Sequence, residues 1–81
     1  MRGVVRHINE EFGLVAVETE HGEYTVFGLM DGGVVNHGDV IVGDLEQLDH
    51  QALRNETSDT EIHVYIEDTE LSPDDARAKL S

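Results

Sequence analysis

The sequence predicts a mainly β fold: a small antiparallel barrel of five strands, followed by an extra C-terminal strand and a short helix. The 81 residues suffice for one small domain with a modest core. Valine-rich runs of strand length alternate with turn residues, and eight glycines against one proline favour strands over a helical bundle. The chain has no cysteine, so burial and backbone pairing must hold it together.

The first three strands are predicted over residues 3–8, 12–19 and 24–29. Residues 9–11 form a short connection, and residues 20–23 form a hairpin turn in which Gly22 can adopt a positive φ. Because such runs pair with their neighbours in sequence, we expect an antiparallel meander. Alternation along the strands predicts that four valines fill the barrel: Val5, Val15, Val17 and Val26.

The second half of the barrel is predicted from a loop and two further strands. Three glycines and an asparagine make residues 30–39 a loop. A fourth strand is expected over residues 40–48, with Val40, Val42 and either Leu45 or Leu48 pointing inward. Residues 49–51 form a turn, and residues 52–57 form a short fifth strand. Five strands with one long loop after the third are typical of an OB-type barrel, which protects sheet edges at this size.

The C-terminal part adds one strand and one helix to this barrel. Residues 62–66 alternate between apolar and polar positions and predict the extra strand. Ser72 is expected as the N-cap of a helix, with Pro73 in its first position and two acids where the helix dipole favours them. We therefore assign the OB-like barrel to residues 1–57 and expect residues 58–81 to pack on it within the same domain.

The charge balance is strongly acidic. Eighteen acidic residues face five basic ones, which gives a net charge of −13. Such a field repels nucleic acids and anionic membranes at long range. A salt-adapted proteome, a basic protein partner or solubility alone each explains this acidity. No apolar run approaches the roughly 20 residues of a membrane span, and the start lacks the pattern of a signal peptide, so a soluble cytoplasmic protein is expected.

Two stretches carry a family resemblance. Residues 3–9, G-V-V-R-H-I-N, followed by residues 12–15, F-G-L-V, resemble the opening of cold-shock domains. Those domains begin with a pattern like G-x-V-K-W-F-N and continue into K-G-F-G-F-I. Residues 38–40 and 52–55 also sit where that family has similar short motifs, so the resemblance covers roughly residues 3–57.

The resemblance implies that single-stranded RNA or DNA binds on the first three strands, where aromatic side chains stack on bases and basic side chains meet phosphates. The candidate nucleic-acid-binding residues are Arg6, His7, Phe12, Leu14, Phe27 and Arg54. Alternation is expected to place His7, Phe12, Leu14, Thr25 and Phe27 on one face. Several family aromatics are replaced here, and each lost aromatic removes about 1–3 kcal/mol of base stacking. Glu10 and Glu11 stand where the family has lysine and glycine, so only weak binding is expected.

Two functions follow as hypotheses. The first is a non-enzymatic OB-fold module that resembles a cold-shock domain and binds single-stranded nucleic acid weakly. The alternative is an acidic protein–protein interaction module on the same fold, in which the same face docks a basic or apolar partner. A third arrangement, in which residues 62–80 cover that face, removes the platform. The five histidines lack the spacing of metal ligands, and no catalytic or cofactor motif is present, so neither a metal, a cofactor nor enzymatic activity is expected.

Overall fold

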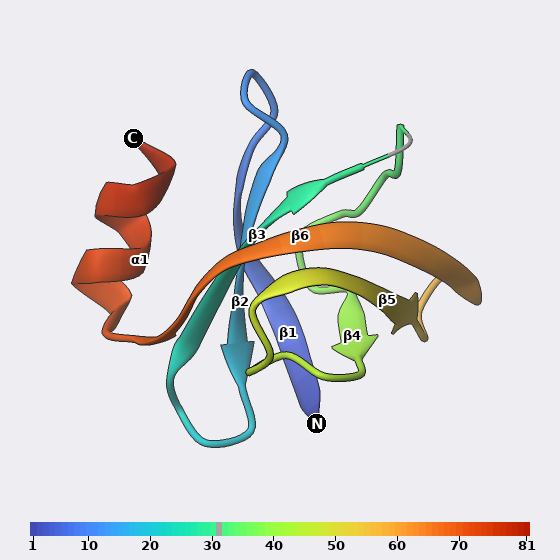
Figure 1. The fold of residues 1–81 in the computed structure, drawn as a ribbon, viewed down its shortest axis with the longest axis horizontal. Helices are drawn as coiled ribbons and strands as arrows, with labels where there is room; N and C mark the ends of the chain where they lie inside the picture. Colours follow the sequence, from blue (N-terminus) through green and yellow to red (C-terminus); the bar gives the residue numbers. More distant parts are fainter. Residues whose placement is uncertain (31) are drawn as a thin grey trace.

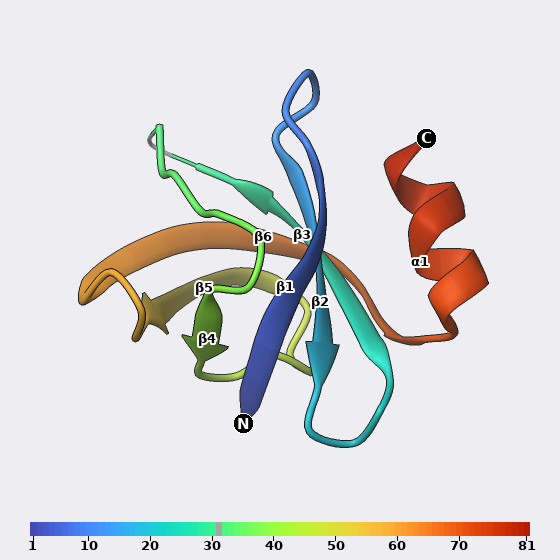
Figure 2. The same cartoon turned by 180° about the vertical axis from the view of Figure 1, so that it is seen from behind.

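The computed structural model describes residues 1–30 and 32–81, which form six strands and one helix (Figures 1 and 2). The elements are β1 (Arg2–Asn9), β2 (Leu14–Thr19), β3 (Tyr24–Leu29), β4 (Val40–Val42), β5 (Asp49–Asn55), β6 (Thr60–Leu71) and α1 (Pro73–Leu80). The strands close into a barrel in the order β1-β2-β3-β6-β5-β4, and all neighbouring pairs are antiparallel. The predicted mainly β fold with a small antiparallel barrel and a short C-terminal helix is confirmed, with six strands in the barrel instead of five.

The sixth strand, β6, completes the barrel. Its first half, up to Ile66, pairs with β5, and its second half, from Val64 to Leu71, pairs with β3. The sequence predicts only residues 62–66 as a strand, outside a barrel that ends at residue 57. The observed strand has 12 residues because it serves two neighbours in succession. The predicted boundary after residue 57 therefore does not separate a barrel from an added segment.

The region around Gly43 differs from the predicted fourth strand. The expected strand over residues 40–48 is limited to Val40–Val42, and the expected turn at residues 49–51 is the start of β5. The chain bends at Gly43. This residue has φ +142°, and a Cβ there would lie only 2.6 Å from Leu53 Cδ2, so the position favours glycine. Ile41, and neither Val40 nor Val42, is the buried residue of β4. The predicted loop 30–39 contains no strand in its described residues, and Asp31 lies outside them.

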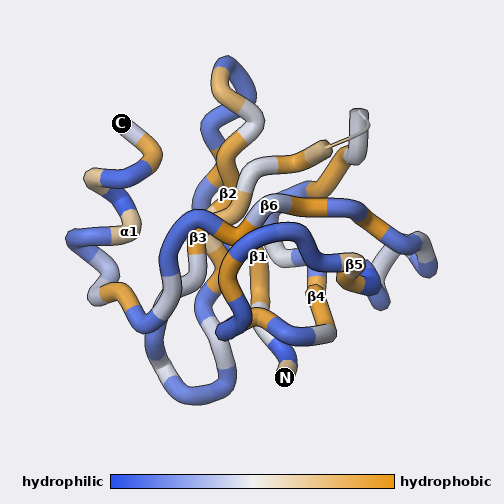
Figure 3. Tube along the Cα trace, viewed as in Figure 1, coloured by the Kyte–Doolittle hydropathy of each residue, from blue (hydrophilic) through white to orange (hydrophobic). Residues whose placement is uncertain are grey.

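Two hydrophobic clusters form the core, and Figure 3 shows apolar residues recurring along the strands. The larger fills the barrel and consists of Val5, Val15, Val17, Phe27, Val35, Ile41, Leu45, Leu53, Ile62, Val64 and Ile66. The smaller lies between the sheet and α1 and consists of Ala16, Tyr24, Val26, Ala76 and Leu80. Three of the four valines predicted to fill the barrel do so, whereas Val26 lies outside it, beneath the helix. The molecule therefore has an inner core and an outer one.

Helix α1 forms as its sequence predicts. The Ser72 Oγ accepts a hydrogen bond of 3.1 Å from the Asp75 backbone N–H, and Pro73 occupies the first turn. Two acidic residues stand in the first turn and two basic ones in the last, which complements the helix dipole. Ala76 and Leu80, one turn apart, are the buried residues of the helix. They hold α1 beside β1, β2 and β3 (Figures 1 and 2).

Candidate interaction surface

Helix α1 covers much of the face on which the sequence places a base-stacking platform. Leu14 is half-buried and packs against the outer cluster, which contains the helix residues Ala76 and Leu80. The cover is tight, because Ala76 has no exposed surface. Leu14 therefore contributes to helix docking and presents only part of its side chain to a ligand.

Phe27 lies inside the barrel and has no exposed surface. Its neighbours across the sheet are Val15 on β2 and Ile66 on β6. Thr25 points the same way and its Oγ1 donates a 2.8 Å hydrogen bond to the Leu45 carbonyl. The prediction that Phe27 and Thr25 share an outer face with His7 and Phe12 is wrong. Strand β3 carries buried residues on both faces from Tyr24 to Phe27, so its apolar pattern does not reveal which face is inside.

His7 is half-buried and already has an aromatic neighbour. A β-bulge interrupts the pairing of β1 with β2 between Val5 and His7, which changes the side to which the chain presents its residues. The His7 ring stacks on Tyr24, with the centroids 6.2 Å apart and the planes 20° apart. One face of the imidazole is therefore turned toward another side chain of the protein.

The two arginines proposed to meet phosphates are each paired with a carboxylate. Arg6 Nε lies 3.1 Å from Glu18 Oε1, and the Arg54 guanidinium contacts the carboxylate of Asp59. Both pairs are exposed to solvent and contribute little to stability. They nevertheless cancel much of the local positive field, so a phosphate would have to displace an acidic side chain already in place.

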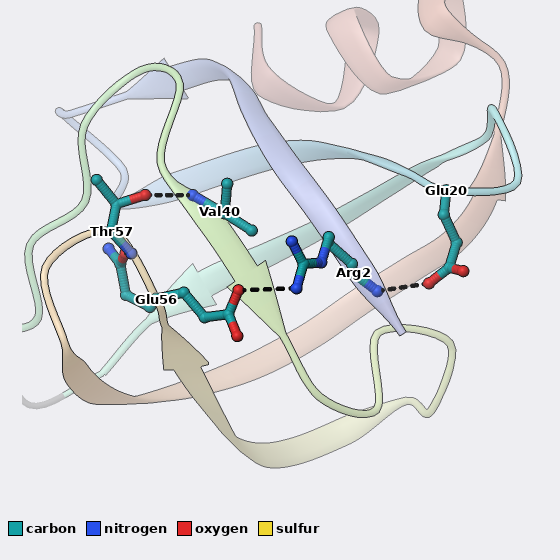
Figure 4. Close-up of polar contacts among 6 residues, drawn as sticks. Arg2, Glu20, Val40, Glu56 and Thr57 are labelled. Atoms are coloured by element: carbon teal, nitrogen blue, oxygen red, sulfur yellow. Dashed lines mark hydrogen bonds and ion pairs between the residues drawn. The ribbon is translucent and has the colours of Figure 1, made fainter.

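Arg2 and Lys79 show the same compensation. The Arg2 guanidinium lies 3.0 Å from a Glu56 carboxylate oxygen, and the Arg2 backbone N–H donates to a Glu20 carboxylate oxygen at 2.8 Å. Figure 4 shows both contacts. Lys79 Nζ lies 4.0 Å from a carboxylate oxygen of Asp68. Four of the five basic side chains are thus paired, which leaves the acidic excess to dominate the surface.

Residues 9–13, here called the hairpin tip, project from the barrel between β1 and β2 (Figure 1). Phe12 is 64% exposed there. Asn9 holds the tip from both sides: its Oδ1 accepts from the Phe12 backbone N–H at 3.2 Å, and its Nδ2 donates to the Leu80 carbonyl at the end of α1. The Gly13 carbonyl accepts from the Leu29 backbone N–H at 2.8 Å. Phe12 is therefore an exposed aromatic residue on a fixed backbone.

A hollow of about 340 Å³, here called the loop groove, lies between the hairpin tip and the connection from β3 to β4. Its apolar lining comes from Ile8, Leu29, Val34 and Val35, and Glu10 adds a carboxylate. Val34 is 73% exposed, whereas Val35 is anchored in the barrel core. The groove therefore combines a fixed apolar wall with an acidic group beside Phe12.

The loop groove was not predicted from the sequence. The glycines of residues 30–39 predict a loop and give no indication of a groove. The signal available was the Val34-Val35 pair, which is unusual in the middle of a glycine-rich loop. In the structure Val35 packs in the barrel core, and the neighbouring Val34 is exposed to solvent.

Comparisons with known proteins supply no relative. No family model, no curated protein and no solved structure matches the chain.

In residues 1–30 and 32–81, no group of three or more His, Asp or Glu side chains is placed to hold a metal ion. Within the same residues, no helix has the length and apolar character to cross a membrane. The site must therefore be interpreted from its own geometry.

Proposed function

We propose that this chain is a non-catalytic, acidic interaction module that docks a basic segment of a partner protein on the hairpin tip and the loop groove. One observation carries the proposal: Phe12 is 64% exposed, yet hydrogen bonds through Asn9 fix its backbone to α1. Exposed aromatic side chains on rigid supports lose little conformational entropy on binding and are frequent anchors of interfaces. The adjoining groove offers a place for an apolar side chain of the partner.

Charge determines the kind of partner. Glu10 and Glu11 directly precede Phe12 in the sequence, and the whole chain has a net charge of −13. A second copy of the same chain would bring a like charge to this surface, which opposes association. A segment that contains lysine or arginine beside an apolar residue complements the tip and is steered toward it.

Single-stranded nucleic-acid binding through a cold-shock-like face stays a prediction. Of its aromatic residues, Phe12 is exposed and His7 is half-buried against Tyr24. Base stacking on two such rings supplies about 1–3 kcal/mol each, whereas micromolar affinity needs about 8 kcal/mol. Because Arg6 and Arg54 are paired with carboxylates, phosphate contacts add little. A basic polypeptide agrees better with this surface.

Selection from a random peptide library tests the proposal without a known partner. Peptides are selected on the unmodified protein and then measured against Phe12→Ala and Leu48→Ala. Leu48 is 49% exposed but lies between β4 and β5, so it is a matched control. We expect the selected peptides to combine Lys or Arg with an apolar residue. Phe12→Ala should weaken the binding of these peptides by about tenfold or more, as for an interface hot spot. Leu48→Ala should leave their affinity unchanged.

Equal binding to Phe12→Ala, or selected peptides without basic residues, would contradict the proposal. An oligo-pyrimidine strand, titrated at low salt and followed by backbone amide shifts, tests the nucleic-acid hypothesis in parallel. If the oligo-pyrimidine produces saturable shifts at the His7 and Phe12 amides and the peptide selection fails, nucleic acid and not a protein is the ligand of this surface. If the two amides do not move, the nucleic-acid hypothesis should be abandoned.

A further inference from the structure

A second hollow lies on the outer face of β5 and β6. It has a volume of about 290 Å³ and is lined by Met30, His50, Gln51, Ala52, His63 and Val64. Cross-strand pairing sets His50 opposite Tyr65, and Ala52 opposite His63. Two exposed rings, those of His50 and His63, thus line the hollow, and the exposed ring of Tyr65 lies next to it, opposite His50.

The ring of His50, which lines the hollow, packs against the ring of Tyr65 beside it. The His50 and Tyr65 rings meet edge to face, with centroids 5.1 Å apart and planes 88° apart. On the other side of Tyr65, the partner across β3 is Gly28, which has no side chain. Tyr65 is 42% exposed. Small residues on both neighbouring strands therefore leave the rings accessible from the solvent side.

Carboxylates surround these rings. Asp49 Oδ1 accepts a 3.1 Å hydrogen bond from the Tyr65 hydroxyl, and a Glu61 carboxylate oxygen lies 3.2 Å from His63 Nε2. A Glu67 carboxylate oxygen is 3.6 Å from the position that a Cβ on Gly28 would take. The hydrogen bond to Asp49 raises the pKa of the Tyr65 phenol above its usual value, and the charges of Asp49 and Glu67 raise it further. Negative potential thus acts on Tyr65 from both flanks.

We propose that this hollow receives the guanidinium group of one arginine side chain of the partner. A guanidinium is planar, stacks on aromatic rings and donates hydrogen bonds to carboxylates. His50 and His63 supply rings in the lining of the hollow, and the carboxylate of Glu61 lies beside it, against His63. The inference rests on the proposed function, because it assumes a basic partner segment. The two sites are also linked through the chain, because Leu29 lines the loop groove and the next residue, Met30, lines this hollow.

N-acetyl-arginine amide serves as the probe, titrated into the protein and followed by amide shifts. The citrulline analogue is its neutral control of nearly the same shape. We expect saturable shifts at His50, His63 and Tyr65 with arginine, and binding of citrulline weaker by about two- to fivefold, the factor of an exposed cation–π contact. Tyr65→Leu and Glu67→Gln should each weaken the binding of the arginine probe by a similar factor. Glu23→Gln removes the same charge next to β3 in the turn after β2 and should leave binding unchanged.

Equal binding of arginine and citrulline, or arginine shifts that neither variant alters, would overturn the inference. Should Tyr65→Leu fail to fold, Glu67→Gln decides alone, because it changes an exposed side chain by one charge. Failure of this titration leaves the Phe12-dependent peptide selection intact, since free arginine does not probe the hairpin tip. Failure of the peptide selection, in turn, removes the proposed function while the arginine titration is still measured on its own.

Discussion

Replacing Phe27 by alanine tests whether this ring belongs to the core or to a binding face. The side chain has no exposed surface and packs in the inner cluster. Removal of a buried phenylalanine side chain costs about 3–5 kcal/mol in lost burial and residual cavity. At about 0.05–0.15 kcal/mol per residue, a chain of this length has roughly 4–12 kcal/mol of total stability. We therefore expect Phe27→Ala to remove about a quarter or more of the free energy of unfolding.

Urea unfolding followed by circular dichroism measures this loss, and Phe12→Ala is the matched control. The control deletes the same atoms from a ring that is 64% exposed, so we expect a change within about 0.5 kcal/mol. Should Phe27→Ala be unfolded in water, Phe27→Leu, which keeps most of the volume, is expected to fold with a loss of less than about 1.5 kcal/mol. Equal destabilisation by the two alanine variants would refute the assignment of Phe27 to the core.

Three further changes test the hairpin tip, the β5–β6 face and the barrel interior. Asn9→Ala should speed hydrogen exchange at the Phe12 amide and cost about 1–3 kcal/mol for two hydrogen bonds; unchanged exchange would contradict an anchored tip. Asp49→Asn should lower the pKa of Tyr65 in a tyrosinate absorbance titration, assigned with Tyr65→Phe. The raised pKa of Tyr65 contributes stability at pH values below the ordinary pKa of tyrosine, and this contribution disappears as the pH rises through the pKa of the folded state. The free energy of unfolding of Asp49→Asn should therefore decline less at alkaline pH. Asn55→Ala should cost at least about 2 kcal/mol in urea unfolding, since the buried amide donates to Asp39 and accepts two backbone N–H groups.

The first half of the barrel and the helix were predictable because local signals are strong there. The turn at Gly22 and the capping residues before α1 act over a few residues, and each fixes the element next to it. The sixth strand was harder, since the clean alternation ends at Ile66. Its remainder, from Glu67 to Leu71, is polar and half-exposed and is held as a strand by β3, a partner distant in sequence.

The candidate site was predicted only in part, and β3 explains why. Strand β3 is buried on both faces, and its polar residue Thr25 points inward, so polarity does not mark its outer side. The sequence alone therefore does not determine which of Thr25, Val26 and Phe27 point into the barrel. Phe12 was expected on an exposed face because the first hairpin resembles that of cold-shock domains, and it is 64% exposed, although it lies in the turn before β2 and not in the predicted strand over residues 12–19. The loop groove depends on how two loops meet in space, which no local pattern specifies.

The position of β6 between β3 and β5 also governs the order of events on the ribosome. Until that strand has been synthesised, β3 and β5 each present an unpaired edge, and the valine-rich interior between them is open to water. Unpaired strand edges and exposed apolar surface are the features that lead nascent chains to aggregate. The barrel therefore closes only when the chain as far as Leu71 has emerged, and a translation product that stops before Thr60 would depend on chaperones instead of folding early.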